Sequence, residues 1–301
     1  MAFDSSGRAG SLEPTSNSVQ NDSARSAPLE VSRVVIESEE SGVQLNLGDL
    51  WAYRELLYFL TLRDIKVRYK QTLMGAVWVV IQPLMTMLIF TLIFNKFARL
   101  DTKDIPYPLF AYSGLLLWTF FSNAVTTGTY SLVNNSHLVT KVYFPRVFMP
   151  TAAVGAGLVD LAIASLLLIS LAIYYGVRPS WGALMLPLMV FLAAMLALGT
   201  GMLVSALTVK YRDLRHALPF VMQFWMFASP VIYPSSIVPE QWRWILLINP
   251  MTGILEGFRA ALTGQPFDWT MIAISAAVAT TLLAVAFYVF RALEDTFADV
   301  I

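Results

Sequence analysis

The sequence predicts an all-α integral membrane protein: six transmembrane helices preceded by an amphipathic interfacial helix. Residues 109–133 carry no charged side chain, and about 20 apolar residues in a helix cross the hydrocarbon core of a bilayer. Apolar runs of similar length recur along the chain. Hydrophobic residues make up 57% of the sequence and charged residues only 13%, whereas a soluble domain has about 25% charged residues. These observations favour a protein built into a membrane.

The apolar runs place the six membrane segments. We expect them at about 74–94, 109–133, 148–175, 184–208, 218–233 and 270–290. The fifth is short and lies among Pro219, Pro230 and Pro234, so we expect it to cross by tilting or with help from the residues that follow. A periplasmic re-entrant helical hairpin is expected between the fifth and sixth segments.

The chain is expected to have two parts. Residues 1–43 are rich in Ser, Asn, Glu and Ala and would form a disordered cytoplasmic tail, and residues 44–301 would form the transmembrane domain. Lys and Arg are more frequent in alternate connections, among them 134–147 and 209–217. Because basic residues favour the cytoplasmic side, this bias places both termini in the cytoplasm.

Residues 45–71 combine an aromatic side with a basic side. On a helical wheel, Arg63, Lys66 and Lys70 lie together on one stripe. A second stripe consists of apolar and aromatic residues: Leu47, Trp51, Tyr58, Leu62, Ile65 and Tyr69. This pattern suits a helix lying in the membrane interface with its cations toward anionic headgroups. A seventh span is disfavoured by the five charges between Arg63 and Lys70.

The connection 134–147 pairs a small apolar group with cations. Leu138, Tyr143 and Phe144 lie close in sequence to Lys141 and Arg146. Such a knob could dock into a groove on a soluble partner, and an ordinary short loop with interfacial aromatics is an equal alternative.

The stretch 234–269 holds two apolar pieces, about 241–248 and 251–262, separated by the turn signal Asn249–Pro250. Neither piece is long enough to cross, so we expect two short helices that dip into the outer leaflet and return, or a hairpin lying flat on the membrane. Trp242 and Trp244 fit an interfacial position, and Glu256 and Arg259 have the i,i+3 spacing of an ion pair.

Asp160 is the most informative residue inside a predicted span. A carboxylate within the membrane is costly and marks either a functional site or a group that holds two helices together by hydrogen bonds. The sequence leaves both readings open.

Several classes of function are disfavoured. The chain has no cysteine and two histidines, so we expect no metal site and no catalytic thiol. A net charge of zero gives no field suited to nucleic acid. No GxxxxGK[ST] phosphate loop, GxSxG or HExxH motif occurs, so we expect neither an ATP site of that kind nor a catalytic centre.

Three segments resemble a known family. They are LLYFLTLRDIKVRYKQTLMGAVWVVIQPL at 56–84, HLVTKVYFPR at 137–146 and NPMTGILEGFR at 249–259. In this order they resemble the permease subunit of ABC-2 type exporters, in the branch that moves O-antigen, capsule or teichoic-acid polymers. The resemblance covers about 45–293.

The resemblance implies a transport subunit, not an enzyme, in the bacterial inner membrane. Two copies would form a channel, driven by two separate ATP-binding cassette subunits that hold ATP and Mg²⁺. The helix at 45–71 would gate the cytoplasmic entrance, 134–147 would contact the ATPase, and 237–265 would cap the outer end. The substrate would be a lipid-linked polysaccharide such as O-antigen on a polyprenyl pyrophosphate, whose charged end suits Arg63, Lys66 and Lys70.

Two alternatives remain at this stage. An ABC-2 exporter of a drug or a lipid would share the fold, and a membrane-embedded enzyme acting on a lipid-linked sugar would share the apolar composition.

Overall fold

The computed structural model describes residues 51, 53–70, 75, 77–97, 105–141, 144–178 and 180–300. These residues form helices and connecting turns, and no strand occurs among them. The tail at 1–43, Leu47 and Tyr143 lie outside the described residues.

Among the described residues, five helices are long and apolar enough to cross a membrane: Val77–Phe94, Tyr107–Asn134, Phe148–Tyr174, Trp181–Lys210 and Trp269–Glu294. They confirm five of the expected segments. In element terms they comprise α3 (Val77–Phe90) with the start of η1 (Thr91–Phe97), α4 (Tyr107–Asn134), α6 (Phe148–Tyr174), η2 (Trp181–Met185) with α7 (Leu186–Lys210), and most of α11 (Trp269–Val300).

The segment expected at 218–233 forms a shorter helix. Helix α8 spans Leu214–Ala228, 15 residues, and at 1.5 Å per residue it reaches only about 22 Å. It ends at Ala228 because Pro230 cannot continue the backbone hydrogen bonding. The pair Glu240–Ile248 and Pro250–Thr263, whose axes meet at 94°, has the length and composition of either a broken span or a re-entrant loop.

Helix α4 is the centre of the bundle. In its most apolar window 78% of the residues are buried, against 11% for Val77–Phe94. It packs against α6 and α7, and also contacts α3, α8 and α10. The hydroxyl of Tyr112 donates to the Ala164 carbonyl of α6 at 2.9 Å, which satisfies a polar group inside the core. The central position of α4 brings residues of several helices to its surface.

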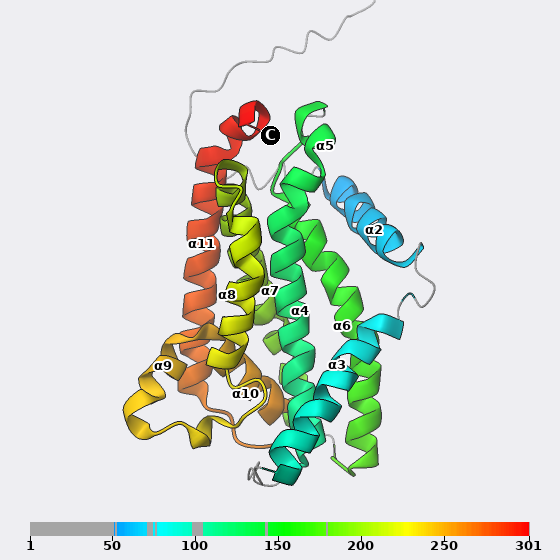
Figure 1. The fold of residues 1–301 in the computed structure, drawn as a ribbon, viewed down its shortest axis with the longest axis vertical. Coiled ribbons are helices and arrows are strands. Elements are labelled where there is room, and N and C mark those ends of the chain that lie inside the picture. Colours follow the sequence, from blue (N-terminus) through cyan, green and yellow to red (C-terminus); the bar gives the residue numbers. More distant parts are fainter. Residues whose placement is uncertain are drawn as a thin grey trace, which may run out of the picture. The chain divides into compact units, whose positions relative to one another are not determined.

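Shorter helices occupy the two ends of the bundle (Figure 1). Near the end at which α11 finishes lie α2 (Arg54–Lys70) and α5 (Ser136–Lys141). An apolar cluster that includes Leu60, Val139 and Phe297 joins α2, α5 and α11 there. Near the end at which α11 begins lie η3 (Ser235–Ile237), η4 (Glu240–Trp242), α9 (Arg243–Ile248) and α10 (Pro250–Thr263). We call these the α5 end and the α10 end.

Candidate functional site

Asp160 joins helix α6 to helix α2. Its side chain is buried, and it forms an ion pair with Arg68 and accepts a hydrogen bond from the Tyr69 hydroxyl. Burial and the hydrogen bond to Asp160 raise the pKa of Tyr69, so the phenol stays protonated as a donor. Of the two readings of Asp160, the contacts match a group that holds two helices together.

Sequence reasoning did not single out Arg68. It lies in the same basic segment as Arg63, Lys66 and Lys70 but on a different side of the helical wheel. A buried carboxylate needs a cationic or hydrogen-bonding partner. Arg68 is a cation of this helix that is turned away from the stripe of Arg63, Lys66 and Lys70, and that position was the available signal.

A cavity of about 310 Å³ opens beside this ion pair. Helices α2, α3, α4 and α6 contribute its walls. Its polar lining residues are Arg68, Gln82, Thr119, Asn123, Thr127 and Asp160. Aromatic and aliphatic side chains, among them Trp78 and Phe120, complete the lining. The cavity therefore places polar groups and aromatic rings between membrane-spanning helices, and we call it the α3–α4 cavity.

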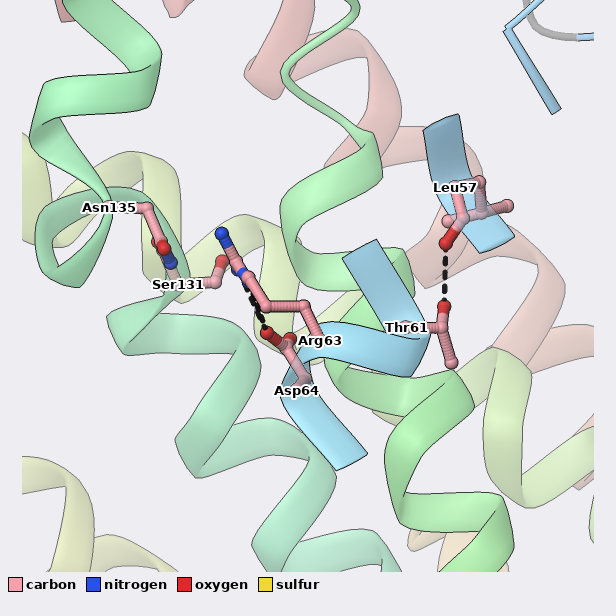
Figure 2. A network of polar contacts seen from close by, with 6 residues as sticks. All are labelled: Leu57, Thr61, Arg63, Asp64, Ser131 and Asn135. Atoms are coloured by element: carbon pink, nitrogen blue, oxygen red, sulfur yellow. Dashed lines mark hydrogen bonds and ion pairs between the residues drawn. The ribbon is translucent and has the colours of Figure 1, made fainter. Parts of the chain in front are cut away.

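The three cations expected at the entrance lie on one groove of α2. Arg63, Lys66 and Lys70 line a hollow of about 370 Å³ together with Phe59, Leu62 and Val67. The guanidinium of Arg63 is paired with Asp64 at 2.8 Å, as Figure 2 shows. Lys66 and Lys70 are exposed, and no ion pair is formed by either within the described part of the chain. The structure thus brings the three cations together. Arg63 is neutralised in part by Asp64, whereas the two lysines remain available to bind an anion.

Two local hydrogen bonds near this groove support helix geometry. The Thr61 hydroxyl donates to the Leu57 carbonyl of the same helix at 2.8 Å (Figure 2). At the end of α4, the Asn135 amide donates to the Ser131 carbonyl, also at 2.8 Å (Figure 2). The Asn135 bond satisfies a backbone carbonyl in the last turn of α4, whereas the Thr61 bond adds to a carbonyl inside α2.

The residues expected to contact a soluble partner divide into inward and outward groups. Phe144 is buried in the cluster that joins α2, α5 and α11, and Leu138 packs against it. Lys141 is exposed at the end of α5. The backbone N–H of Arg146 donates to Glu294 of α11 at 3.1 Å. Phe144 therefore anchors the loop within its own chain, and Lys141 is the charge left on the surface.

Asn249 organises the bend between α9 and α10. Its Oδ1 accepts hydrogen bonds from the Met251 N–H at 3.1 Å and from the Trp225 indole at 3.0 Å. Its Nδ2 donates to the Ser229 hydroxyl at 2.8 Å. Asn249 is thus the N-cap of α10, and the buried Pro250 takes the first helical position, where a missing N–H costs nothing. Trp242 and Trp244 remain about half exposed.

Arg259 is buried and holds the turn that follows α8. Its Nη1 donates to the Pro230 carbonyl at 2.7 Å and its Nη2 to the Val231 carbonyl at 2.6 Å. Its guanidinium carbon lies 3.7 Å from the centre of the Phe110 ring. Among the described residues no ion pair joins Arg259 to Glu256, so the pairing suggested by their spacing is not formed. The irregular turn supplies carbonyls without helical donors, and Arg259 satisfies two of them.

Gly114 leaves the space that this arrangement needs. A Cβ at position 114 would overlap the Val231 carbonyl oxygen and the Arg259 guanidinium. We therefore expect Gly114→Ala to destabilise the protein by about 1–3 kcal/mol through overpacking. Thermal unfolding of the purified protein in detergent measures the effect. Gly128→Ala is the matched control on α4, because its Cβ would meet nothing nearer than 3.7 Å. Equal stability of the two variants would contradict the conclusion that Gly114 leaves the space that Arg259 and the Val231 carbonyl need.

Comparison with known proteins agrees with the three resembling segments. Residues 55–263 match the family model described as ABC-2 type transporter. The chain is 32% identical to the O-antigen export system permease protein RfbA of Myxococcus xanthus, over 83% of this chain and 97% of that protein. It is 27% identical to the protein of that name from Klebsiella pneumoniae, over 86% and 98%. It is 24% identical to the polysialic acid transport protein KpsM of Escherichia coli, over 67% and 79%. The chain belongs to the ABC-2 type transporter family.

Proposed function

We propose that this chain is the membrane-spanning subunit of an ATP-driven exporter of a lipid-linked polysaccharide, with O-antigen on a polyprenyl pyrophosphate as its substrate. The observation that carries the proposal is the match over nearly the whole length of a relative named as an O-antigen export permease. The α3–α4 cavity supports it, because a polar polymer needs polar groups along its path through the membrane.

The motor belongs to other chains in this proposal. The sequence holds no GxxxxGK[ST] loop, so ATP and Mg²⁺ would bind to two separate ATPase subunits attached to a homodimer of this chain. Helix α5 and the loop to Arg146 form the contact with the ATPase. The cluster joining α2, α5 and α11 would carry a displacement of α5 to α2, because packed interiors transmit strain.

Variants of this loop separate docking from packing. We expect Lys141→Glu to weaken the complex with the ATPase while leaving the unfolding temperature unchanged, because Lys141 is exposed. We expect Phe144→Ala to lower stability by about 3–5 kcal/mol, because it empties a buried site. Co-purification with the ATPase, measured beside thermal unfolding, distinguishes them. An intact complex in the Lys141→Glu variant would remove α5 from the docking surface.

The proposal places the α5 end in the cytoplasm and the α10 end in the periplasm. With no native cysteine, single substitutions report sidedness without background. We expect Ser236→Cys to react with a membrane-impermeant thiol reagent in cells with permeabilised outer membranes, and His137→Cys to react only after the inner membrane is opened. Both positions are exposed. The reverse pattern would overturn the orientation.

Helices α9 and α10 form the outer cap in this proposal, entering and leaving the outer leaflet without crossing it. The network around Asn249 and Arg259 supports a rigid element, because it satisfies the irregular backbone between α8 and α10. On the opposite side, α2 is an interfacial gate helix whose lysines meet the anionic end of the lipid.

Deleting the gene tests the proposed substrate. We expect loss of surface polysaccharide together with intracellular accumulation of the lipid-linked polymer. The natural chain should restore surface polysaccharide and end the accumulation, whereas Asp160→Leu should do neither. If the deletion strain keeps normal surface polysaccharide, and restoring the natural chain changes only its resistance to drugs or lipids, export of a different cargo would be favoured.

A further inference from the structure

Two amide side chains lie unpaired on neighbouring spans. Gln82 of α3 and Asn123 of α4 are exposed, and within the described ranges neither side chain has a hydrogen-bond partner. Both line the α3–α4 cavity. An amide facing hydrocarbon without a partner is costly, so these groups require water or a ligand with hydrogen-bonding groups.

The charges of the cavity favour a neutral ligand. Among the described residues of its lining, Arg68 and Asp160 are the acidic and basic ones, and they form an ion pair with each other. A phosphate would have to displace Asp160 to gain Arg68 and would then leave the carboxylate uncompensated. A hydroxyl group needs no such displacement, because it can donate to Asp160 or accept from an amide. Gln82 and Asn123 each offer both a donor and an acceptor, and Thr119 and Thr127 add hydroxyls.

An aromatic surface lies beside these polar groups. The indole of Trp78 is 57% exposed and lines the same cavity, and the largely buried Phe120 contributes to the same lining. A flat aromatic ring can cover the apolar C–H face of a sugar while the hydroxyl groups at the edge of the sugar form hydrogen bonds with other residues. The volume of about 310 Å³ is at the small end of the range of ligand sites, roughly 300–1,000 Å³, which suits one ring.

From this geometry we infer that the α3–α4 cavity binds a neutral, hydroxyl-rich ring, stacked on Trp78 and hydrogen-bonded by Gln82 and Asn123. The inference rests on the proposed function, and in that setting the ring is a pyranose unit of the polymer close to its lipid-linked end. The site differs from the groove of Arg63, Lys66 and Lys70, which receives the charged pyrophosphate.

A single cysteine tests the site. In the full exporter with its ATPase, Val79→Cys should react with a water-soluble maleimide, because Val79 is a partly exposed residue of the cavity lining that has no hydrogen-bonding role in the proposed site. Neutral oligosaccharides released by mild acid from the cell's own surface polysaccharide should slow this reaction several-fold, whereas inorganic pyrophosphate should not. Leu166→Cys is the control. Leu166 is exposed on the span α6 and lies outside the cavity lining, so we expect it to face lipid, where a water-soluble maleimide does not react.

Three results would overturn the inference. Protection by pyrophosphate alone would make the cavity an anion site. Equal reaction rates with and without oligosaccharide would show a water-filled space that binds no sugar. Absence of labelling in the assembled exporter would show that the α3–α4 cavity is covered by the second copy or by lipid.

Substitutions at Trp78 separate stacking from structure. In the Val79→Cys background, Trp78→Phe should keep protection by the oligosaccharides and Trp78→Leu should lose it several-fold, with both proteins equally monodisperse. If the gene proves necessary for surface polysaccharide and these labelling results fail, the inference falls and the proposed function stands. If the gene is dispensable for surface polysaccharide, the proposed function itself fails.

Discussion

Asp160→Leu is expected to destabilise the protein strongly, by about 3–5 kcal/mol, because it leaves Arg68 as an uncompensated charge beside the bundle. It also removes the acceptor of the Tyr69 hydroxyl. Since Asp160 links α6 to α2, loosening of α2 should accompany the loss. Thermal unfolding in detergent measures stability, and protease sensitivity between residues 54 and 70 measures release of the helix.

Two further variants isolate the charge. Asp160→Asn keeps an acceptor for Tyr69 and should fall between the natural protein and Asp160→Leu. The double variant Arg68→Met with Asp160→Leu removes both charges and should recover part of the lost stability. Unchanged stability of Asp160→Leu would show that the pair contributes nothing. Loss of export by a fully stable Asp160→Asn protein would show a functional role for the ionised carboxylate.

The second large effect is expected at the groove on α2. Lys66→Ala with Lys70→Ala should weaken capture of the lipid-linked polymer by roughly five- to 150-fold for each residue, because each charged contact to phosphate contributes about 1–3 kcal/mol where water is partly excluded. The half-saturation concentration for glycolipid stimulation of the ATPase, in the reconstituted complex, reports this loss. The membrane spans should remain intact, because both side chains are exposed.

Arg63→Ala is the matched comparison. Its guanidinium is already paired with Asp64 at 2.8 Å, so its removal should change the half-saturation concentration less than removal of either lysine. An unchanged half-saturation concentration in the double lysine variant would leave these residues with a role in topology alone.

The sequence was sufficient to locate the long spans and the two short helices on either side of Asn249, but not the end of α8. Helix α4 covers Tyr107–Asn134 where hydropathy predicts 109–133, because a long uncharged run has one economical structure. Helix α8 ends at Ala228 rather than near 233, because hydropathy continues through Pro230 while the backbone hydrogen bonds do not. The break at Asn249 was predictable because an N-cap followed by proline is a local signal.

The candidate site depended more on tertiary packing. The cost of a buried charge drew attention to Asp160, but the packing of α2 on α6 that brings Arg68 to it has no local signal. Spacing suggested that Arg259 pairs with Glu256, whereas Arg259 binds carbonyls of a turn that follows another helix. Phe144 is likewise buried in an apolar cluster that includes residues of α11, far away in sequence. Sequence patterns report neighbours along a helix and do not report which helices meet.

Transport by purified components tests the central claim most directly. The chain and its partner ATPase would be reconstituted in vesicles with the lipid-linked polysaccharide supplied on the ATPase side, and the polymer appearing on the opposite side would be measured with an impermeant glycan-cleaving enzyme. We expect polymer to appear only with ATP and only when both proteins are present. Hydrolysis of ATP by this chain alone, or an active complex that never moves the polymer, would contradict the account.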